Sequence, residues 1–311
     1  MPFWNRGGDE TDEQRQRREA SLAAIEAGGI PLPAQERLGE LGRRGGDFFT
    51  SDLSVGEFAL VREAGFRPVT QVLGTSFYHV GWQWMPGRSW STPGAGYTTE
   101  LETQSAAWNE ARRLAFGRLA EEAERAGAHA VVGVRVDRAE YDWASDMVAI
   151  TAVGTAIASE RYELGAQTVL SNLSGQEFAK LFAHGYWPVG IAAATTICYV
   201  VTGWQQKRAM TGFFSSWQNQ ELVDFTRGVY EARGRAIFNV QQQARALGAD
   251  GIVGVRFDQE LREREYDANG SSRTDLIVTL HVLGTAIVEL DRPGEPPPMY
   301  VALPLDARRD R

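Results

Sequence analysis

The chain has 311 residues, 43% of them hydrophobic, and a formal net charge of −8 at pH 7. This length suits two domains or one domain built from two halves, and the acidic balance argues against nonspecific nucleic-acid binding, which needs a basic surface. No apolar run approaches the roughly 18 residues of a membrane span, and the N-terminus lacks an apolar secretory core. We therefore expect a cytoplasmic protein with no membrane span and no nucleic-acid partner.

Residues 1–46 are predicted to form an N-terminal helical or flexible appendage. A helix is expected over Thr11–Ala27, ended by the glycines that follow it. Residues 30–33 contain two prolines and are expected to be extended, and a short second helix is expected over residues 34–41. Two interpretations stay open, a mobile arm or a helix docked on the body, with partial docking favoured. The docking side chains would be Leu22, Ile25 and Leu38.

Beyond this appendage the chain contains one pattern twice, which predicts a first repeat over residues 47–160 and a second over 168–291. Each repeat opens with a serine three residues before a glutamate, Ser54/Glu57 and Ser174/Glu177, the spacing of a capping box. A β-rich segment follows in both, over residues 69–81 and 189–203. The inserts that come next, 84–97 and 206–224, differ in composition. Their aromatic residues are interpreted as an interface in preference to a ligand site.

A long helix is predicted in each repeat from an apolar stripe at steps of three and four residues. In the first repeat the stripe consists of Trp108, Ala111, Ala115, Leu119, Ala123 and Ala126. Adding 121 to each number gives six apolar residues in the second repeat, so the two helices correspond. Gly127 and Gly248 are expected to end them in the left-handed conformation. The carboxylates Glu121, Glu122 and Glu124 are interpreted as a solvated face.

The clearest repetition comes directly after these helices. Residues 126–137 read AGAHAVVGVRVD and residues 247–258 read LGADGIVGVRFD, identical at 7 of 12 positions. Alternation of valine with glycine and arginine predicts strands over 130–136 and 251–257. A charged loop is expected next, longer in the second repeat (259–274), and then a last strand over 147–158 or 276–290 that carries Gly-Thr-Ala-Ile. Residues 292–311 are expected to form a proline-rich, charged tail.

This order of a helix, a V-G-V-R-x-D strand, a charged loop and a G-T-A-I strand resembles the YbjQ-type family of small bacterial proteins, catalogued as heavy-metal-binding. The best match runs from Glu231 to Asp258 and from Leu283 to Val288, and the resemblance covers roughly 48–160 and 168–290. It implies α+β units that assemble into homo-pentamers through their sheets. The chain is then a tandem fusion, of α+β class, in which each unit is a small β-sheet with one long packed helix.

The polar candidates for a ligand site lie on the predicted strands. Arg135 and Asp137, like Arg256 and Asp258, are two residues apart and share a strand face. Such a pair fits a small anion held by arginine, or a salt bridge across a strand or subunit interface, and the second interpretation is favoured. Thr155 and Thr285 lie at matching positions of the last strands, and His281 lies at the position of Thr151 on the same face. Thr155, Thr285 and His281 belong to the same candidate set.

Metal and catalytic chemistry find little support in the sequence. Borderline metals need cysteine or histidine ligands at tight spacing, whereas this chain has one cysteine, Cys198, and four separated histidines, at positions 79, 129, 184 and 281. Cys198 lies in an apolar run and is interpreted as a buried structural thiol. No catalytic residues, resident metal or cofactor are predicted.

These expectations favour a non-enzymatic, ring-like homo-oligomer that acts as a scaffold or binds a small ligand or a protein partner. Two alternatives stay open. One is a metal-ion binding protein, as the family description implies. The other is an enzyme that uses the arginine–aspartate pairs in a pocket between subunits.

Overall fold

The computed structural model describes residues 11–43, 48–82, 96–140, 147–162, 167–203, 219–268 and 271–290. These residues form six helices and eight strands. Most of both inserts and the expected C-terminal tail lie outside the described residues. None of the six described helices combines the length and apolarity that crossing a lipid bilayer requires.

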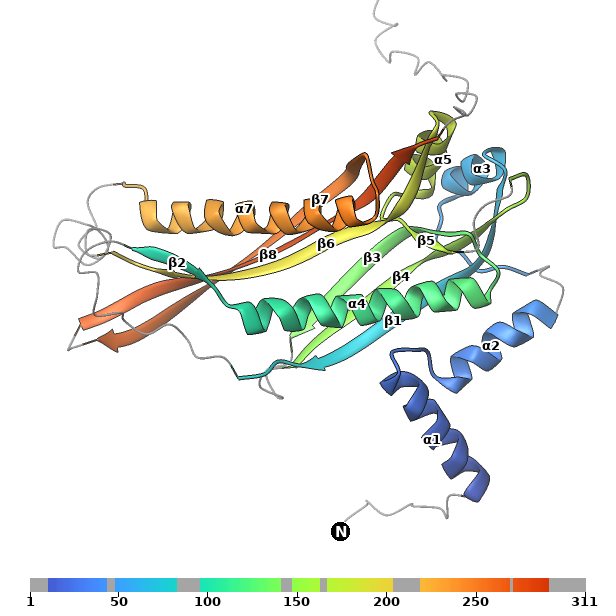
Figure 1. Cartoon of the computed structure of the whole chain (residues 1–311), viewed down its shortest axis with the longest axis horizontal. Helices are drawn as coiled ribbons and strands as arrows, with labels where there is room; N and C mark the ends of the chain where they lie inside the picture. Colours follow the sequence, from blue (N-terminus) through green and yellow to red (C-terminus); the bar gives the residue numbers. More distant parts are fainter. Residues whose placement is uncertain are drawn as a thin grey trace, which may run out of the picture.

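Each repeat contributes a similar series of elements, so the predicted α+β class with one long helix per unit is confirmed (Figure 1). The first repeat comprises α3 (Val55–Glu63), β1 (Phe66–His79), β2 (Tyr97–Glu100), α4 (Glu102–Arg125), β3 (Ala130–Glu140) and β4 (Met147–Ser159). The second comprises β5 (Val169–Leu170), α5 (Gly175–Ala183), β6 (Tyr186–Val201), α7 (Val223–Ala246), β7 (Gly251–Ala268) and β8 (Ser271–Glu289).

The two four-stranded sheets exchange strands between repeats. The first sheet has the order β1-β4-β3-β5 and the second has the order β2-β6-β8-β7. Strand β5, from the second repeat, pairs in parallel with β3 of the first. Strand β2, from the first repeat, pairs antiparallel with β6 of the second. Each sheet is therefore completed by the other repeat, which interlocks the two units.

Helix α4 lies between the two sheets, whereas α7 covers the outer face of the second sheet (Figure 1). Trp108 and Ala111 of α4 belong to one core cluster with Ile150 of β4 and Ile197 of β6. Alternate residues of β6 point the other way, toward Ala232 and the other small side chains of α7. Because side chains alternate along a strand, β6 is buried on both faces.

The small residues in the helical stripe allow a close approach between α4 and β1. A Cβ atom added at Gly74 of β1 would lie only 2.0 Å from the carbonyl oxygen of Ala115 and 2.6 Å from the backbone nitrogen of Leu119. Glycine is thus required where the helix backbone meets the strand.

The local signals in the sequence gave correct predictions. Ser54 and Ser174 each accept a hydrogen bond from the backbone N–H of the glutamate three residues on, completing capping boxes at α3 and α5. Gly127 and Gly248 have φ angles of 73° and 72° and follow α4 and α7 in the left-handed conformation.

Two predictions about charged residues were wrong. The charged segment 259–274 is not a loop, because β7 continues to Ala268 and β8 begins at Ser271 in one long hairpin. Charged side chains are compatible with these strands because β7 is an edge strand whose residues from 254 to 263 are exposed. Glu122 is not on a solvated face. It is buried and accepts hydrogen bonds from the backbone N–H of Leu73 and from the guanidinium of Arg37, both at 3.0 Å.

The N-terminal helix α2 (Leu32–Arg43) packs against α4, and helix α1 (Asp12–Glu26) packs against α2. Leu38 and Ile30 are buried, whereas Leu22 is exposed. Helix α2 begins at Leu32, so the last two residues of the segment 30–33 are helical and not extended as expected. Pro33 then lies in the first turn, where its missing N–H would have had no partner within the helix.

Candidate functional site

Arg135, the first sequence candidate, forms an ion pair with a residue far away in the chain. Its guanidinium lies 2.6 Å from the carboxylate of Asp52, before α3, and not against Asp137 on its own strand. Asp52 also accepts a hydrogen bond from the hydroxyl of Thr155 at 2.5 Å and donates its backbone N–H to the same oxygen. Thr155 is fully buried. These contacts fasten the segment before α3 onto β4.

In the second repeat, neutral groups make the corresponding contact between the last strand and the segment before the short helix α5. Thr285 donates to the amide oxygen of Asn172 at 2.6 Å and accepts the backbone N–H of Asn172 at 3.0 Å. The amide nitrogen of Asn172 donates to the carbonyl of Gly254. Asn172 thus takes the position of Asp52, and Arg256, the counterpart of Arg135, is exposed. Thr155 and Thr285 each hydrogen-bond to the segment just before a short helix, α3 or α5. Both threonines therefore have a structural role.

Asp258 and His281 are opposite each other in the β7–β8 register, but Asp258 binds an arginine of the other repeat. Its carboxylate pairs with Arg138 of β3. Strands β3 and β7 belong to different sheets. This ion pair therefore joins the two repeats across their junction.

His281 belongs to a buried polar cluster that the sequence did not indicate as a unit. Its Nδ1 atom is 2.9 Å from the hydroxyl of Thr195, which also accepts a hydrogen bond from Arg112 at 2.9 Å. Arg112 further donates to the carbonyl of Ala193 and the amide oxygen of Asn109. Burial, and secondarily the charge of Arg138, lowers the pKa of Arg112 to about 10. The position of Arg112 next to Ala111, inside the buried stripe, is the signal that could have indicated this cluster.

The space beside this cluster is too small for an organic substrate. Its volume is about 10 Å³, which corresponds to roughly one water-sized sphere. Burial, with the charges of Arg138 and Arg112, lowers the pKa of His281 to about 3. Thr195 and His281 therefore form a hydrogen-bonded pair that no substrate can reach.

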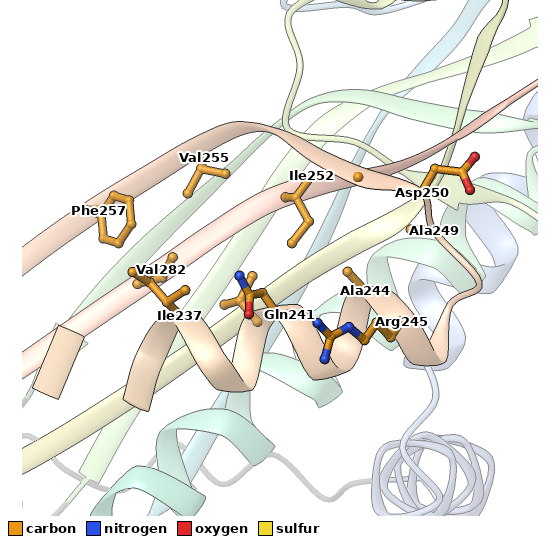
Figure 2. Close-up of a pocket in the computed structure, with 12 residues that line it drawn as sticks. Ile237, Gln241, Ala244, Arg245, Ala249, Asp250, Ile252, Val255, Phe257 and Val282 are labelled. Carbon is orange, nitrogen blue, oxygen red and sulfur yellow. The ribbon is translucent and has the colours of Figure 1, made fainter. Parts of the chain in front are cut away.

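A larger apolar groove lies between α7 and β7 (Figure 2). Its volume is about 500 Å³, within the range of roughly 300–1,000 Å³ that is usual for ligand sites. Ile237 of α7 and Ile252, Val255 and Phe257 of β7 line it, with Asp250 and Arg245 at one end. Few polar groups point into it, so its chemistry favours an apolar occupant.

Comparison with known proteins gives the family. A family model described as "Putative heavy-metal-binding" matches residues 95–160 and 191–289. The chain belongs to this YbjQ-type family. Because the match falls in two segments, one per repeat, the resemblance and the tandem arrangement inferred from the sequence are confirmed.

The chain is also similar to an encapsulin nanocompartment protein of Mycobacterium tuberculosis. The two are 35% identical over 218 residues, which cover 67% of this chain and 77% of the relative. No solved structure matches the chain.

The residues present do not fit the metal site that the family description implies. Within the described part of the chain, no three histidine, cysteine or acidic side chains converge as metal ligands. Cys198 is buried, and burial raises the pKa of its thiol to about 12, so it stays protonated at neutral pH. Metals bind the thiolate, and we derive no metal chemistry for this chain.

Proposed function

We propose that the protein is a non-enzymatic assembly module whose copies join head to tail, each through a copy of the junction that holds its two repeats together. One observation carries this proposal. In the first repeat, the surface of α4 and β3 is buried inside the chain. The corresponding surface of the second repeat, on α7 and β7, is exposed.

Strands β3 and β7 give the clearest case. Val134 of β3 is 2% exposed, whereas the corresponding Val255 of β7 is 41% exposed. Two residues further along the same strands, Val136 is half-buried whereas the corresponding Phe257 is 47% exposed. Exposed apolar residues that line one groove mark an interaction surface. A second copy of the chain is the occupant that the repeat itself specifies.

The segment that fills the corresponding groove in the first repeat identifies the complementary surface. Leu170 of β5 and Ile191 of β6 pack into the core between α4 and β3. Beside them the N–H groups of Gly133 and Val134 donate to the carbonyls of Leu173 and Ser171. In this segment the two repeats are 120 residues apart, so the equivalents of Leu173 and Ser171 in the first repeat are Leu53 and Ser51. These carbonyls of the next copy would meet Gly254 and Val255, and the exposed Phe48 and Phe49 would lie beside β7.

The outward faces of α7 and β1 are complementary in the same sense. Within the chain, Ser105 and Asn109 of α4 hydrogen-bond to the part of β6 that precedes its pairing with β2, and Ile197 is buried there. The equivalents of Ser105 and Asn109 on α7 are Thr226 and Tyr230, and Tyr230 is exposed. The equivalent of Ile197 on β1 is Phe77, which is 61% exposed. Helix α7 of one copy would thus cover β1 of the next.

A contact of this kind is heterologous, because it joins two different surfaces. Repeated contacts form a ring if the rotation closes and a filament if it does not. The similarity to an encapsulin nanocompartment protein supports a closed assembly and brings a role in a protein compartment as the proposed setting. A small ligand within the assembly is a further part of this proposal.

Native mass spectrometry of the full chain tests the proposal. We expect the wild-type protein to have the mass of several chains and the double variant Val255→Asp/Phe257→Asp to have the mass of one. Leu22→Asp, an exposed apolar position on α1, is the control and should leave the assembly intact. A wild-type protein with the mass of one chain, or an assembled double variant, would contradict the proposal.

A further inference from the structure

The polar cluster at the junction of the repeats contains positive charge without a matching carboxylate. Arg112 is buried, and its partners are the hydroxyl of Thr195, the carbonyl of Ala193 and the amide of Asn109, all of them neutral. No ion pair connects Arg112 with any described carboxylate within 4.0 Å. A buried charge without a counter-charge is costly. The cluster therefore favours an anion.

The hydrogen bonds of the cluster fix where the proton of His281 lies. A guanidinium only donates, so the oxygen of Thr195 accepts from Arg112. Among the described contacts of the Thr195 hydroxyl, Nδ1 of His281, 2.9 Å away, is the acceptor for its proton. The ring proton of neutral His281 consequently lies on Nε2. Burial lowers the pKa of His281 to about 3, so the ring is neutral at physiological pH.

The Nε2–H group of His281 is a buried donor without an acceptor among the described residues. The residue is 4% exposed. A carboxylate oxygen of Glu260 is 4.0 Å away, beyond hydrogen-bond distance, and the Glu260 side chain is 44% exposed. Buried donors in folded proteins are almost always satisfied.

The small cavity is lined by these same side chains. Arg112, Arg138, Thr195 and His281 all border it, together with apolar residues of β3, β4 and β8. Its volume of about 10 Å³ leaves room for a single small species and excludes larger oxyanions. Arg138 adds a second positive charge at the edge of the cavity, where its own partner is Asp258.

We propose that this cavity binds a chloride-sized monoanion, held by Arg112 and by the Nε2–H of His281 and attracted by the charge of Arg138. The anion joins α4 and β3 of the first repeat to β6 and β8 of the second. At the position of His281 the first repeat has Thr151, which is 3.0 Å from Thr75. At the position of Arg138 the second repeat has Gln259. The site therefore occurs once per chain, inside the junction, and is independent of assembly.

Bromide tests the site in the wild-type protein, because it replaces chloride and scatters X-rays anomalously. In crystals grown with sodium bromide we expect an anomalous peak within hydrogen-bond distance of Nε2 of His281. A water molecule without anomalous signal, or the carboxylate of Glu260 in this position, would overturn the proposal.

Two variants test it in solution by chloride NMR line broadening and bromide competition. His281→Thr introduces the residue that the first repeat carries, and it should weaken halide binding roughly ten-fold or more, the loss expected for one hydrogen bond to a charged group. Arg112→Met should abolish binding, whereas Arg113→Met, an exposed neighbour on the same helix, should leave it unchanged. Equal halide binding by the wild type and His281→Thr would overturn the proposal.

Discussion

The junction inside the chain and the two outer faces are built from corresponding elements but differ in burial and charge. Inside, α4 packs against β6, and Ile197 and Val134 are buried. Outside, Phe77 and Val255 occupy the corresponding positions and are exposed. The same fold thus forms one junction within the chain and retains apolar surfaces for another.

The two kinds of surface also differ in polar groups. The inner junction has the buried Arg112, Thr195 and His281, whereas the outer faces have Arg233, Thr75 and Thr151 at these positions. Arg233 is exposed, and its guanidinium lies over the ring of Phe257 at 5.4 Å. Substitutions at matched positions can separate what holds the two repeats together from what would join one chain to the next in the proposed assembly.

The largest effect is expected at the contact between α4 and β1. Gly74→Val places a side chain where a Cβ already lies 2.0 Å from a backbone oxygen, so it should cost about 3 kcal/mol or more, at or above the upper end of overpacking effects. Gly117→Ala, on α4 with no atom within 4 Å of the added carbon, should be neutral or stabilising by up to about 1 kcal/mol. Urea unfolding measures both. Equal stabilities of the two variants would contradict the close packing.

Removal of Arg112 should be the next largest effect. Arg112→Met leaves the carbonyl of Ala193 and the hydroxyl of Thr195 without their donor, which we expect to cost about 3 kcal/mol, since hydrogen bonds to charged groups are each worth roughly 1.5–3 kcal/mol. Arg233→Met, its counterpart on α7, should change the free energy of unfolding of a single chain by less than about 0.5 kcal/mol. Urea unfolding in the Val255→Asp background, which keeps the ring of Phe257 under Arg233, compares them. A similar cost for both would remove the distinction between inner and outer positions.

His281 should make the stability of the inner junction depend on pH. Burial lowers its pKa from 6.5 to about 3 in the folded state, so between these values the unfolded chain binds a proton that the folded chain does not. Its stabilising contribution is complete above pH 6.5 and is lost as the pH falls. Between pH 6.5 and 5 we expect a loss of about 1–2 kcal/mol in halide-free buffer. His281→Thr should reduce this slope in urea titrations, and an unchanged slope would assign the pH dependence to other groups.

The smallest effect is expected where the two repeats differ by one charge. Asp52→Asn introduces the residue that the second repeat has at this position, keeps an acceptor for Thr155 and removes the ion pair with the largely exposed Arg135. The cost should be below about 1 kcal/mol, as for most exposed ion pairs. Thr155→Val, which leaves buried groups unpaired, should cost about 1–3 kcal/mol by the same unfolding measurement. If Asp52→Asn were the more damaging of the two, the ion pair would matter more than the buried hydroxyl.

Much of the fold was predictable because its signals are local. The apolar stripes of α4 and α7, the capping boxes at Ser54 and Ser174 and the glycines after both long helices act over a few residues, and all were correctly interpreted. The strands over 259–274 were missed because charge was taken to indicate a loop. An edge strand that is exposed on both faces has no apolar alternation, so its sequence resembles that of a loop.

The polar sites were less predictable because their partners are distant in sequence. Arg135 was expected beside Asp137 but pairs with Asp52, 83 residues away. Arg112 and His281 meet only through the hydroxyl of Thr195, and three different elements bring them together. Periodicity places a side chain on a face of its own element. It carries no information about which element of the other repeat will cover that face.

The strand exchange has a consequence for what holds the halves together after cleavage. Strand β2 completes the sheet of the second repeat and β5 completes that of the first. The repeats are therefore joined by two exchanged strands as well as by the covalent chain. A single proteolytic cut between β4 and β5 would break the covalent connection and leave both strand pairings in place. The fragments should then co-purify as a noncovalent pair, and neither half would be an autonomous folding unit.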